Sequence, residues 1–138
     1  DATTARGQVV AFALSCQGKF VYAQPSSLRG GPGSPSVGIN LDCSSFVQYC
    51  YWAQNLPFSA GSTAAYRNAA DLVSISTSEV QTGDLRVVYA SGGEQGHVQM
   101  ALGGGAWIEC CYGYGVAVNM SNAWMESRPC YYFRYVGF

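Results

Sequence analysis

The sequence contains little charge and almost no histidine. Only 11% of its 138 residues are charged, the formal net charge is −1, and His97 is the single histidine. A charge so close to zero gives no electrostatic reason to bind nucleic acid or an anionic membrane surface, so neither is an expected partner. The six cysteines include no C-x-x-C pair, whereas a structural zinc site usually has four Cys or His ligands at recognisable spacings. We therefore expect neither a metal ion nor another cofactor.

Long apolar runs are also absent. No segment approaches the roughly 20 apolar residues of a membrane-spanning helix. The start, Asp1 to Thr4, has neither an initiator methionine nor the features of a signal peptide. With 49% hydrophobic residues, the chain is long enough for one compact domain with its own core. We expect residues 1–138 to form a single, monomeric domain that was cut from a longer modular protein.

The pattern of apolar residues predicts helices in the first half of the chain and strands in the second. Helices are expected over residues 3–16 and 42–54, with a short one from 62 or 63 to 70. The Pro-, Gly- and Ser-rich segment 25–40 is expected to be a loop. Strands are expected at 87–90, 96–102, 106–111, 115–120 and 130–136, with a glycine hairpin at 103–105. The predicted fold class is α+β, with N-terminal helices packed on a small antiparallel sheet.

Cys43 is the first candidate for a catalytic residue. It falls in the first turn of the predicted helix 42–54, after a polar loop. Unpaired N–H groups and the positive end of the helix dipole favour a thiolate at such a position, which makes the sulfur a better nucleophile. The alternative is a small buried hydrophobic residue, because most cysteines in proteins have that role.

His97 is the one histidine that can serve such a thiol. A cysteine hydrolase needs a base beside its nucleophile, and imidazole is the usual one. His97 lies in a predicted strand directly after Gly96, which leaves room for another backbone or a substrate. A third polar group should fix the imidazole tautomer. Glu109, twelve residues later across the glycine hairpin, is our candidate; Asn119 and Asn122 are alternatives, and Glu109 is otherwise a solvated strand residue.

Three segments of the sequence resemble a known family. The segments DCSSFV (42–47), GDL (83–85) and GHV (96–98) are similar to the D-C-S-G-F-V, P-G-D-L and G-H-V signatures of the NlpC-type cysteine peptidases. The resemblance runs in order from about Val10 to Phe138. It implies a papain-like core in which a helix bearing the cysteine packs on a small antiparallel sheet bearing the histidine. Members of that family mostly hydrolyse the bond after γ-D-glutamate in peptidoglycan stem peptides, without a metal or cofactor.

The resemblance also implies roles for single residues. By this similarity, the catalytic group consists of Cys43, His97, Glu109 and Tyr22. Tyr22 corresponds to a tyrosine whose hydroxyl reaches the catalytic site, and is otherwise an ordinary core aromatic residue. Asp42 and Ser44 correspond to residues that bind the free amine of the stem peptide. Their alternative roles are helix N-cap and first-turn residue.

The sequence departs from the family pattern at several positions. Ser45 replaces a glycine, and the loop between Tyr22 and Cys43 is longer than usual. The segment STAAY (62–66) stands where the family commonly has Arg-Thr/Ser-x-x-Gln, so the arginine is missing. Glu109 stands where the family has His, Asn or Gln and makes the third group an anion, as in CHAP amidases. These departures bear on the substrate more than on the chemistry.

The sequence therefore predicts a peptidoglycan hydrolase that cuts a stem-peptide bond by Cys/His catalysis. Such an enzyme acts on the bacterial cell wall, either as a secreted protein or as part of a phage particle. One alternative is an amidase or cross-bridge endopeptidase with the same dyad. Another is a catalytically inactive wall-binding or phage-tail module that uses exposed aromatic residues such as Tyr112, Tyr114 and Trp124. The presence of both Cys43 and His97 argues against the inactive module.

Overall fold

The computed structural model describes residues 3–18, 21–22, 40–41, 43–93, 96–111, 115–120 and 122–138. Most of the loop predicted at 25–40 lies outside these ranges. In chain order the elements are α1 (Ala5–Ser15), β1 (Val21–Tyr22), β2 (Asn40–Leu41), α2 (Cys43–Trp52), η2 (Ala64–Asn68), β3 (Leu72–Ile75), η3 (Thr77–Glu79), β4 (Leu85–Val88), β5 (His97–Gly103), β6 (Ala106–Cys111), β7 (Gly115–Asn119), α3 (Ala123–Glu126) and β8 (Tyr131–Tyr135).

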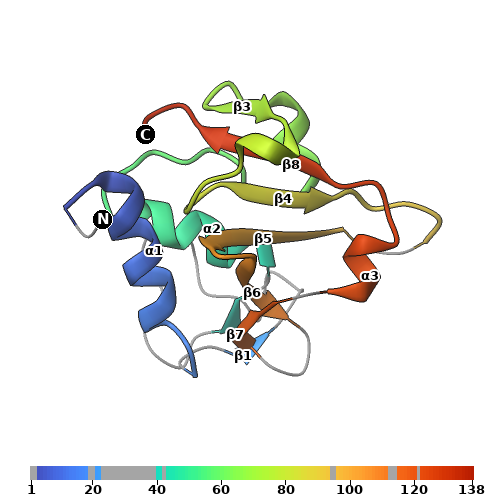
Figure 1. Ribbon diagram of the computed structural model, residues 1–138, viewed down its shortest axis with the longest axis horizontal. Coiled ribbons are helices and arrows are strands. Elements are labelled where there is room, and N and C mark those ends of the chain that lie inside the picture. The colour runs from blue at the N-terminus through green and yellow to red at the C-terminus, as the bar shows by residue number, and fades with distance from the viewer. Residues whose placement is uncertain are drawn as a thin grey trace.

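Within the described ranges, the main sheet has six strands in the order β3-β8-β4-β5-β6-β7. Every neighbouring pair in it is antiparallel. β1 and β2 form a separate parallel pair, which lies near β7 at the lower end of the sheet in Figure 1. In the same view, α1 lies at one side of the sheet with α2 beside it, and α3 lies at the opposite side. The predicted α+β fold, with helices packed on an antiparallel sheet, is confirmed.

The apolar core lies between α1, α2 and one face of the sheet. Alternate residues of β5 and β6 point into this core, and Val98, Met100, Ile108 and Cys110 are all 0% exposed. They pack with apolar residues of α2 such as Phe46. Burial of an aliphatic or aromatic side chain of this size contributes roughly 1.5–3 kcal/mol to stability. This packing fixes α2, and with it the position of its first residue, against the centre of the sheet.

The other face of the same strands carries polar side chains. Because successive strand residues point to opposite faces, His97, Gln99 and Glu109 point away from the core. Arg86 joins them because it pairs with Gln99 in the β4–β5 register. Part of this face is covered at α3, where the N-cap residue Asn122 donates to Glu109 over 3.3 Å. The fold therefore surrounds the predicted catalytic histidine with buried polar groups.

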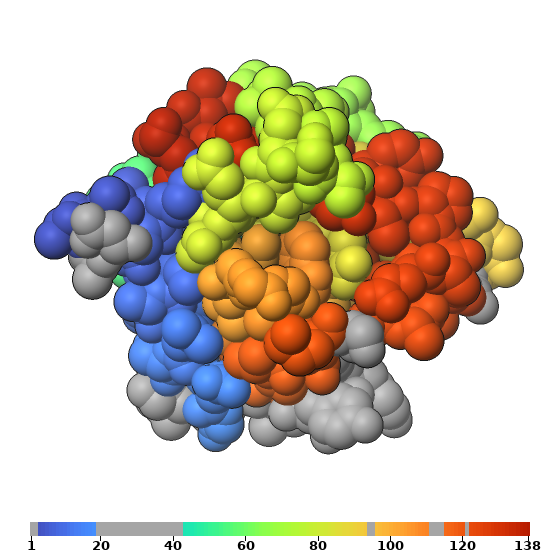
Figure 2. All heavy atoms as spheres, viewed as in Figure 1, coloured from blue at the N-terminus to red at the C-terminus, as the bar shows by residue number. Residues whose placement is uncertain are grey.

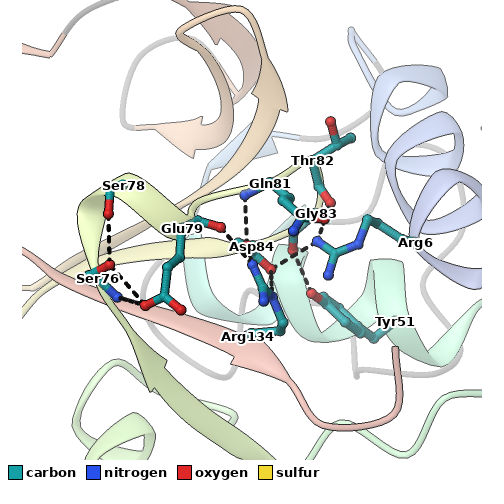
Figure 3. Close-up of polar contacts among 10 residues, drawn as sticks. All are labelled: Arg6, Tyr51, Ser76, Ser78, Glu79, Gln81, Thr82, Gly83, Asp84 and Arg134. Atoms are coloured by element: carbon teal, nitrogen blue, oxygen red, sulfur yellow. Dashed lines mark hydrogen bonds and ion pairs between the residues drawn. The ribbon is translucent and has the colours of Figure 1, made fainter.

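Asp84, in the GDL segment, ties elements from the two ends of the chain to the sheet (Figure 3). Its carboxylate accepts hydrogen bonds from Arg6 of α1 (2.9 Å), Arg134 of β8 (2.8 Å) and the backbone N–H of Gln81 (2.8 Å). Burial raises the pKa of Asp84, but the bonds from Arg134, Gln81 and Arg6 outweigh burial and leave the pKa below its ordinary value. This part of the predicted family signature has a structural function here.

Several elements differ from the sequence prediction, and β1, β2 and η3 are among those that it did not include. Residues 64–68 form a 3₁₀-helix rather than an α-helix, and Thr63 before it makes no side-chain capping bond. β3 and α3 were not predicted. α3 is a single turn in which the side chain of Asn122 accepts a hydrogen bond from Met125 N over 3.0 Å. An element this short shows no apolar periodicity, so only its capping residue marks it in the sequence.

Distant parts of the chain meet at the surface. Figure 2 shows one face on which α1 (blue), the region around β3 (yellow-green), the β5–β6 hairpin (orange) and the α3 region (red-orange) adjoin one another. The glycine hairpin is present as predicted, since Gly103, Gly104 and Gly105 all have positive φ. Among the described residues, no helix has the length and apolar character needed to cross a membrane.

Candidate active site

Cys43 is the first residue of α2, and its side chain is buried, with 3% of the residue exposed. The first N–H groups of a helix have no partner within the helix, so backbone donors lie beside the sulfur. Ser44, which is also buried, donates from Oγ to the carbonyl oxygen of Gly61 over 3.2 Å. The helix-start environment predicted for Cys43 is present, and Ser44 connects it to the loop that follows α2.

The segment from Gly61 to Thr63 links the surroundings of Cys43 with those of His97. Gly61 binds the residue after Cys43. Thr63 packs against Gly96, the residue before His97, where an added Cβ would lie 2.5 Å from Thr63 Oγ1 and 2.6 Å from a backbone oxygen of β4. Position 96 thus requires glycine because of close approach. Ser44 and Gly96, the sequence neighbours of Cys43 and His97, thus both contact this segment, although none of the described contacts joins the thiol to the imidazole directly.

His97 and Glu109 are in direct contact. Nε2 of His97 lies 2.6 Å from Oε1 of Glu109, within the range expected from the sequence. The side chain of His97 is 13% exposed and that of Glu109 only 2%. The antiparallel β5–β6 pairing brings the two residues together on the polar face of the sheet. The carboxylate thus fixes which ring nitrogen of His97 faces the interior.

Several neutral side chains hold the carboxylate of Glu109. Gln99 donates from Nε2 over 2.7 Å, Asn122 donates over 3.3 Å, and Asn119 donates to the second carboxylate oxygen. A buried carboxylate costs several kcal/mol unless its oxygens accept hydrogen bonds, and these amides offset that cost. The two asparagines considered as partners of His97 therefore bind Glu109 instead. They fix the orientation of the group that contacts the imidazole.

Arg86 and Gln99 extend this network, and neither was predicted as part of the site. Arg86 Nε donates to Gln99 Oε1 over 2.9 Å, and Gln99 in turn donates to Glu109. The guanidinium carbon of Arg86 lies 4.3 Å from the ring centroid of Trp107, which gives the cation an aromatic neighbour. The sequence does indicate that His97 and Gln99 share one face of a strand, because they are two residues apart. The sequence does not show that this face is buried.

Tyr66 is a further residue near the nucleophile. Its hydroxyl is the one buried polar side-chain atom, among the described residues, that has no hydrogen-bond partner. The ring packs edge-on against Phe58 and Phe133 at centroid distances of 5.9 Å. Burial raises the pKa of Tyr66 well above its ordinary value, with smaller contributions from Tyr51 and Cys43. Tyr66 stands at the position where the family pattern has glutamine.

Two predicted site residues cannot be placed in this way. The backbone of Tyr22 is in β1 and pairs with Leu41, but its side chain lies outside the described part of the structure, as does Asp42. In the described ranges, no group of three or more His, Cys, Asp or Glu side chains is arranged as ligands of a metal ion.

A helix-start cysteine on an antiparallel sheet with a buried His–Glu pair corresponds to the α+β papain-like fold. Residues 19–133 match the model of the NlpC/P60 family. The chain therefore belongs to the NlpC/P60 family, and the resemblance noted in the sequence is confirmed.

Known relatives include both enzymes and a non-catalytic protein. The chain is 28% identical over 125 residues to the peptidoglycan DL-endopeptidase CwlO of Bacillus licheniformis, covering 89% of this chain but only 27% of CwlO. RipD of Mycobacterium tuberculosis, a non-catalytic NlpC/p60 domain protein adapted to peptidoglycan binding, is 25% identical with a TM-score of 0.70, over 96% of this chain and 98% of RipD. The peptidoglycan hydrolase RipB of the same organism is 24% identical with a TM-score of 0.67, over 94% of this chain and 64% of RipB. The hydrolase RipB and the non-catalytic RipD both share this fold, so activity must be argued from the site.

Proposed function

We propose that this chain is a peptidoglycan hydrolase that uses Cys43 as nucleophile and His97 as base. The observation that carries the proposal is the 2.6 Å contact between His97 Nε2 and Glu109, buried in the same domain that places Cys43 at the start of α2. A module that only binds the wall needs neither a buried His–carboxylate pair nor a helix-start thiol. Membership of the NlpC/P60 family supports the substrate class.

Glu109 is proposed to orient the base. Because Nε2 of His97 faces the carboxylate, Nδ1 is the ring nitrogen that exchanges a proton with the thiol. The anion also stabilises the imidazolium that forms when the thiol is deprotonated. In cysteine hydrolases without substrate, catalytic hydrogen bonds are often long and shorten when substrate binds. The thiol–imidazole contact is therefore expected to form in the substrate complex.

The reaction divides into two steps. The thiolate of Cys43 attacks the carbonyl carbon of the scissile bond, and backbone N–H groups at the start of α2 stabilise the negative charge on the oxygen. His97 then protonates the leaving amine, and the peptide carbonyl remains on sulfur as a thioester. Next, His97 removes a proton from water, which attacks the thioester and returns Cys43 to its free form. No metal or cofactor takes part in this scheme.

The proposed substrate is the bacterial peptidoglycan stem peptide, cut between γ-D-glutamate and the following diamino acid. The similarity to the DL-endopeptidase CwlO supports this choice of bond. Asp42 and Ser44 flank the nucleophile and are proposed to bind the free amine of the stem peptide, while Tyr22 is proposed to reach the catalytic site. A wall substrate places the enzyme outside the cytoplasm, secreted or on a phage particle, as one domain of a longer protein.

The test is to digest purified cell walls and identify the released fragments by mass spectrometry. Cys43→Ala should reduce fragment release by at least ~10³-fold, as expected for loss of a nucleophile. The fold should stay intact, because replacing a thiol with hydrogen changes little volume. Iodoacetamide should abolish the activity of the unmodified protein, whereas EDTA should not. The masses of the fragments name the bond that is cut, and so separate this proposal from an amidase or a cross-bridge endopeptidase.

The rival function is wall binding without hydrolysis, as RipD illustrates. In that case the unmodified protein would bind cell walls and release no fragment under any condition. Near-normal fragment release by folded Cys43→Ala protein would instead show that another residue is the nucleophile. Either result would contradict the proposed function.

A further inference from the structure

Next to the candidate active site lies a hollow of about 340 Å³. This volume is at the lower end of the roughly 300–1,000 Å³ of small-molecule pockets, and it suits a single amino-acid residue. Its lining comes from η2, the end of β4 and the α3 region, and consists of Arg67, Val88, Tyr89, Ala90, Ser91, Trp124, Arg128, Pro129 and Tyr131. It takes no part in the chemistry described above.

Each of the three lining segments is also connected to His97 or Glu109. Val88 pairs with His97 in the β4–β5 register. The chain leading into η2 contains Thr63, which packs against the residue before His97. The N-cap residue of α3, Asn122, donates to Glu109. In Figure 1, α3 lies at the end of the sheet where β4 ends and β5 begins. The hollow therefore adjoins the catalytic histidine.

The charged residues that line the hollow are both positive. Arg67 and Arg128 are its charged members, and none of the described lining residues is acidic. The guanidinium carbon of Arg67 lies 3.8 Å from the ring centroid of Tyr89, and that of Arg128 lies 4.1 Å from the ring centroid of Trp124. Stacking on an aromatic ring orients a guanidinium group for binding a planar anion. Arg128 also donates from Nη1 to the carbonyl oxygen of Trp124 over 2.6 Å and to Ser127 Oγ over 2.9 Å, and these bonds fix its position further. No described carboxylate forms an ion pair with Arg67.

We propose that this hollow is a subsite for a carboxylate-bearing residue of the wall peptide, next to the scissile bond, with Arg67 and Arg128 as its anion-binding groups. This inference rests on the proposed function and adds a determinant of specificity to it. The aromatic rings contact the apolar part of the residue, and the two guanidinium groups bind its carboxylate. Amidation of that carboxylate removes the anion and should weaken recognition.

The test compares one stem tetrapeptide, L-Ala-γ-D-Glu-diaminopimelyl-D-Ala, with its form amidated at the carboxylates beyond the scissile bond. For the unmodified protein, kcat/KM should be about tenfold higher on the free acid, in line with one charge-assisted contact. Arg67→Gln should lower kcat/KM on the free acid about tenfold and change it less than twofold on the amide. Arg67→Lys should recover part of the loss, and Arg128→Lys should weaken the preference for the same reason.

Arg134→Gln is the matched control, because it removes the same charge from a residue outside the hollow. Its ratio of free-acid to amide kcat/KM should equal that of the unmodified protein. Equal losses by Arg67→Gln on both peptides, or no loss on either, would overturn the subsite.

A binding measurement separates failure of this inference from failure of the proposed function. Calorimetric titration of Cys43→Ala protein with the two tetrapeptides should show the same preference for the free acid, and Arg67→Gln in that background should abolish it. Should no peptide be hydrolysed, a preference in binding would still support the subsite. Should hydrolysis proceed without discrimination in either measurement, the proposed function would stand and the subsite would be overturned.

Discussion

Two buried carboxylates, Asp84 directly before β4 and Glu109 in β6, have different kinds of partner. Asp84 binds two guanidinium groups, from Arg6 and Arg134. Glu109 binds side-chain amides and the imidazole of His97. A guanidinium group keeps its charge at every physiological pH, whereas imidazole gains or loses a proton near neutrality. Asp84 is therefore suited to holding elements together, and Glu109 to acting on one side chain whose charge changes during a reaction.

The comparison also shows two ways in which hydrogen-bond partners offset the free-energy cost of burying a carboxylate. A buried carboxylate needs partners for its oxygens. Around Asp84 the partners come from α1 and β8, so each bond joins an end of the chain to the sheet. Around Glu109 they come mainly from neighbouring strands, which are already joined by the sheet. Loss of the first carboxylate should therefore affect stability, and loss of the second should affect activity.

The largest effect is expected for Glu109→Gln, which should slow catalysis. The substitution keeps the size of the side chain but removes the anion, so it should reduce kcat by roughly 10²- to 10³-fold through poorer orientation of His97 and loss of imidazolium stabilisation. KM should change little, because Glu109 does not contact the substrate in the proposed scheme. Steady-state kinetics on a stem peptide measure both values.

The matched control for that experiment is the other buried acid. Asp84→Asn removes a carboxylate of similar burial without touching His97, so kcat should stay within about twofold of normal while the protein is folded. If Glu109→Gln lowered stability and left kcat unchanged, the distinction between the two carboxylates would be wrong.

Asp84→Asn should instead destabilise the fold. It leaves two arginines without their carboxylate, and the free energy of unfolding should fall by about 2–3 kcal/mol. That figure takes account of the partial exposure of Arg6 and Arg134, whose side chains are 20% and 24% exposed. Urea denaturation measured by circular dichroism gives the change, which should appear in the midpoint and not in the slope.

The pH dependence of this effect has a defined sign. The pKa of Asp84 is lowered in the folded state, so its contribution is present above the unfolded pKa of about 3.9 and is lost as pH falls through the folded pKa. The stability difference between the unmodified protein and Asp84→Asn should be constant from pH 7 to about pH 5 and narrow below about pH 4. A difference that grew on acidification would contradict the lowered pKa.

Arg6→Gln should destabilise the fold less than Asp84→Asn. Arg6 contributes one of the two ion pairs of Asp84 and lies over the ring of Phe138, 4.5 Å from its centroid. Its side chain is partly exposed and Arg134 remains, so the loss should be about 1 kcal/mol. Arg67→Gln, which removes a charge that has no described ion pair, should change stability by less than about 0.5 kcal/mol. Equal effects of the two substitutions would show that the Asp84 cluster does not stabilise the protein.

The sequence predicted the parts of the fold that have a strong local signal. The helix at Ala5–Ser15 begins after Thr4, whose side chain accepts a hydrogen bond from Gly7 N, and such a capping residue is visible in the sequence. The β5–β6 hairpin was equally accessible, because consecutive glycines adopt the positive φ that a tight turn requires. β3 and α3 were missed because a strand or helix of four residues has too few positions to show a period.

For the candidate site, the sequence alone led to Cys43, His97 and Glu109, because few residue types suit a thiol nucleophile and its base. Two-residue periodicity and a hairpin of known centre were enough to place Glu109 near His97 on the neighbouring strand. The roles of Arg86, Gln99 and the asparagines depended on which face of the sheet is buried and on where α3 packs. Packing of distant segments decides both, so only the tertiary structure shows that Glu109 lies in a buried polar network and that Arg67 and Arg128 line one hollow.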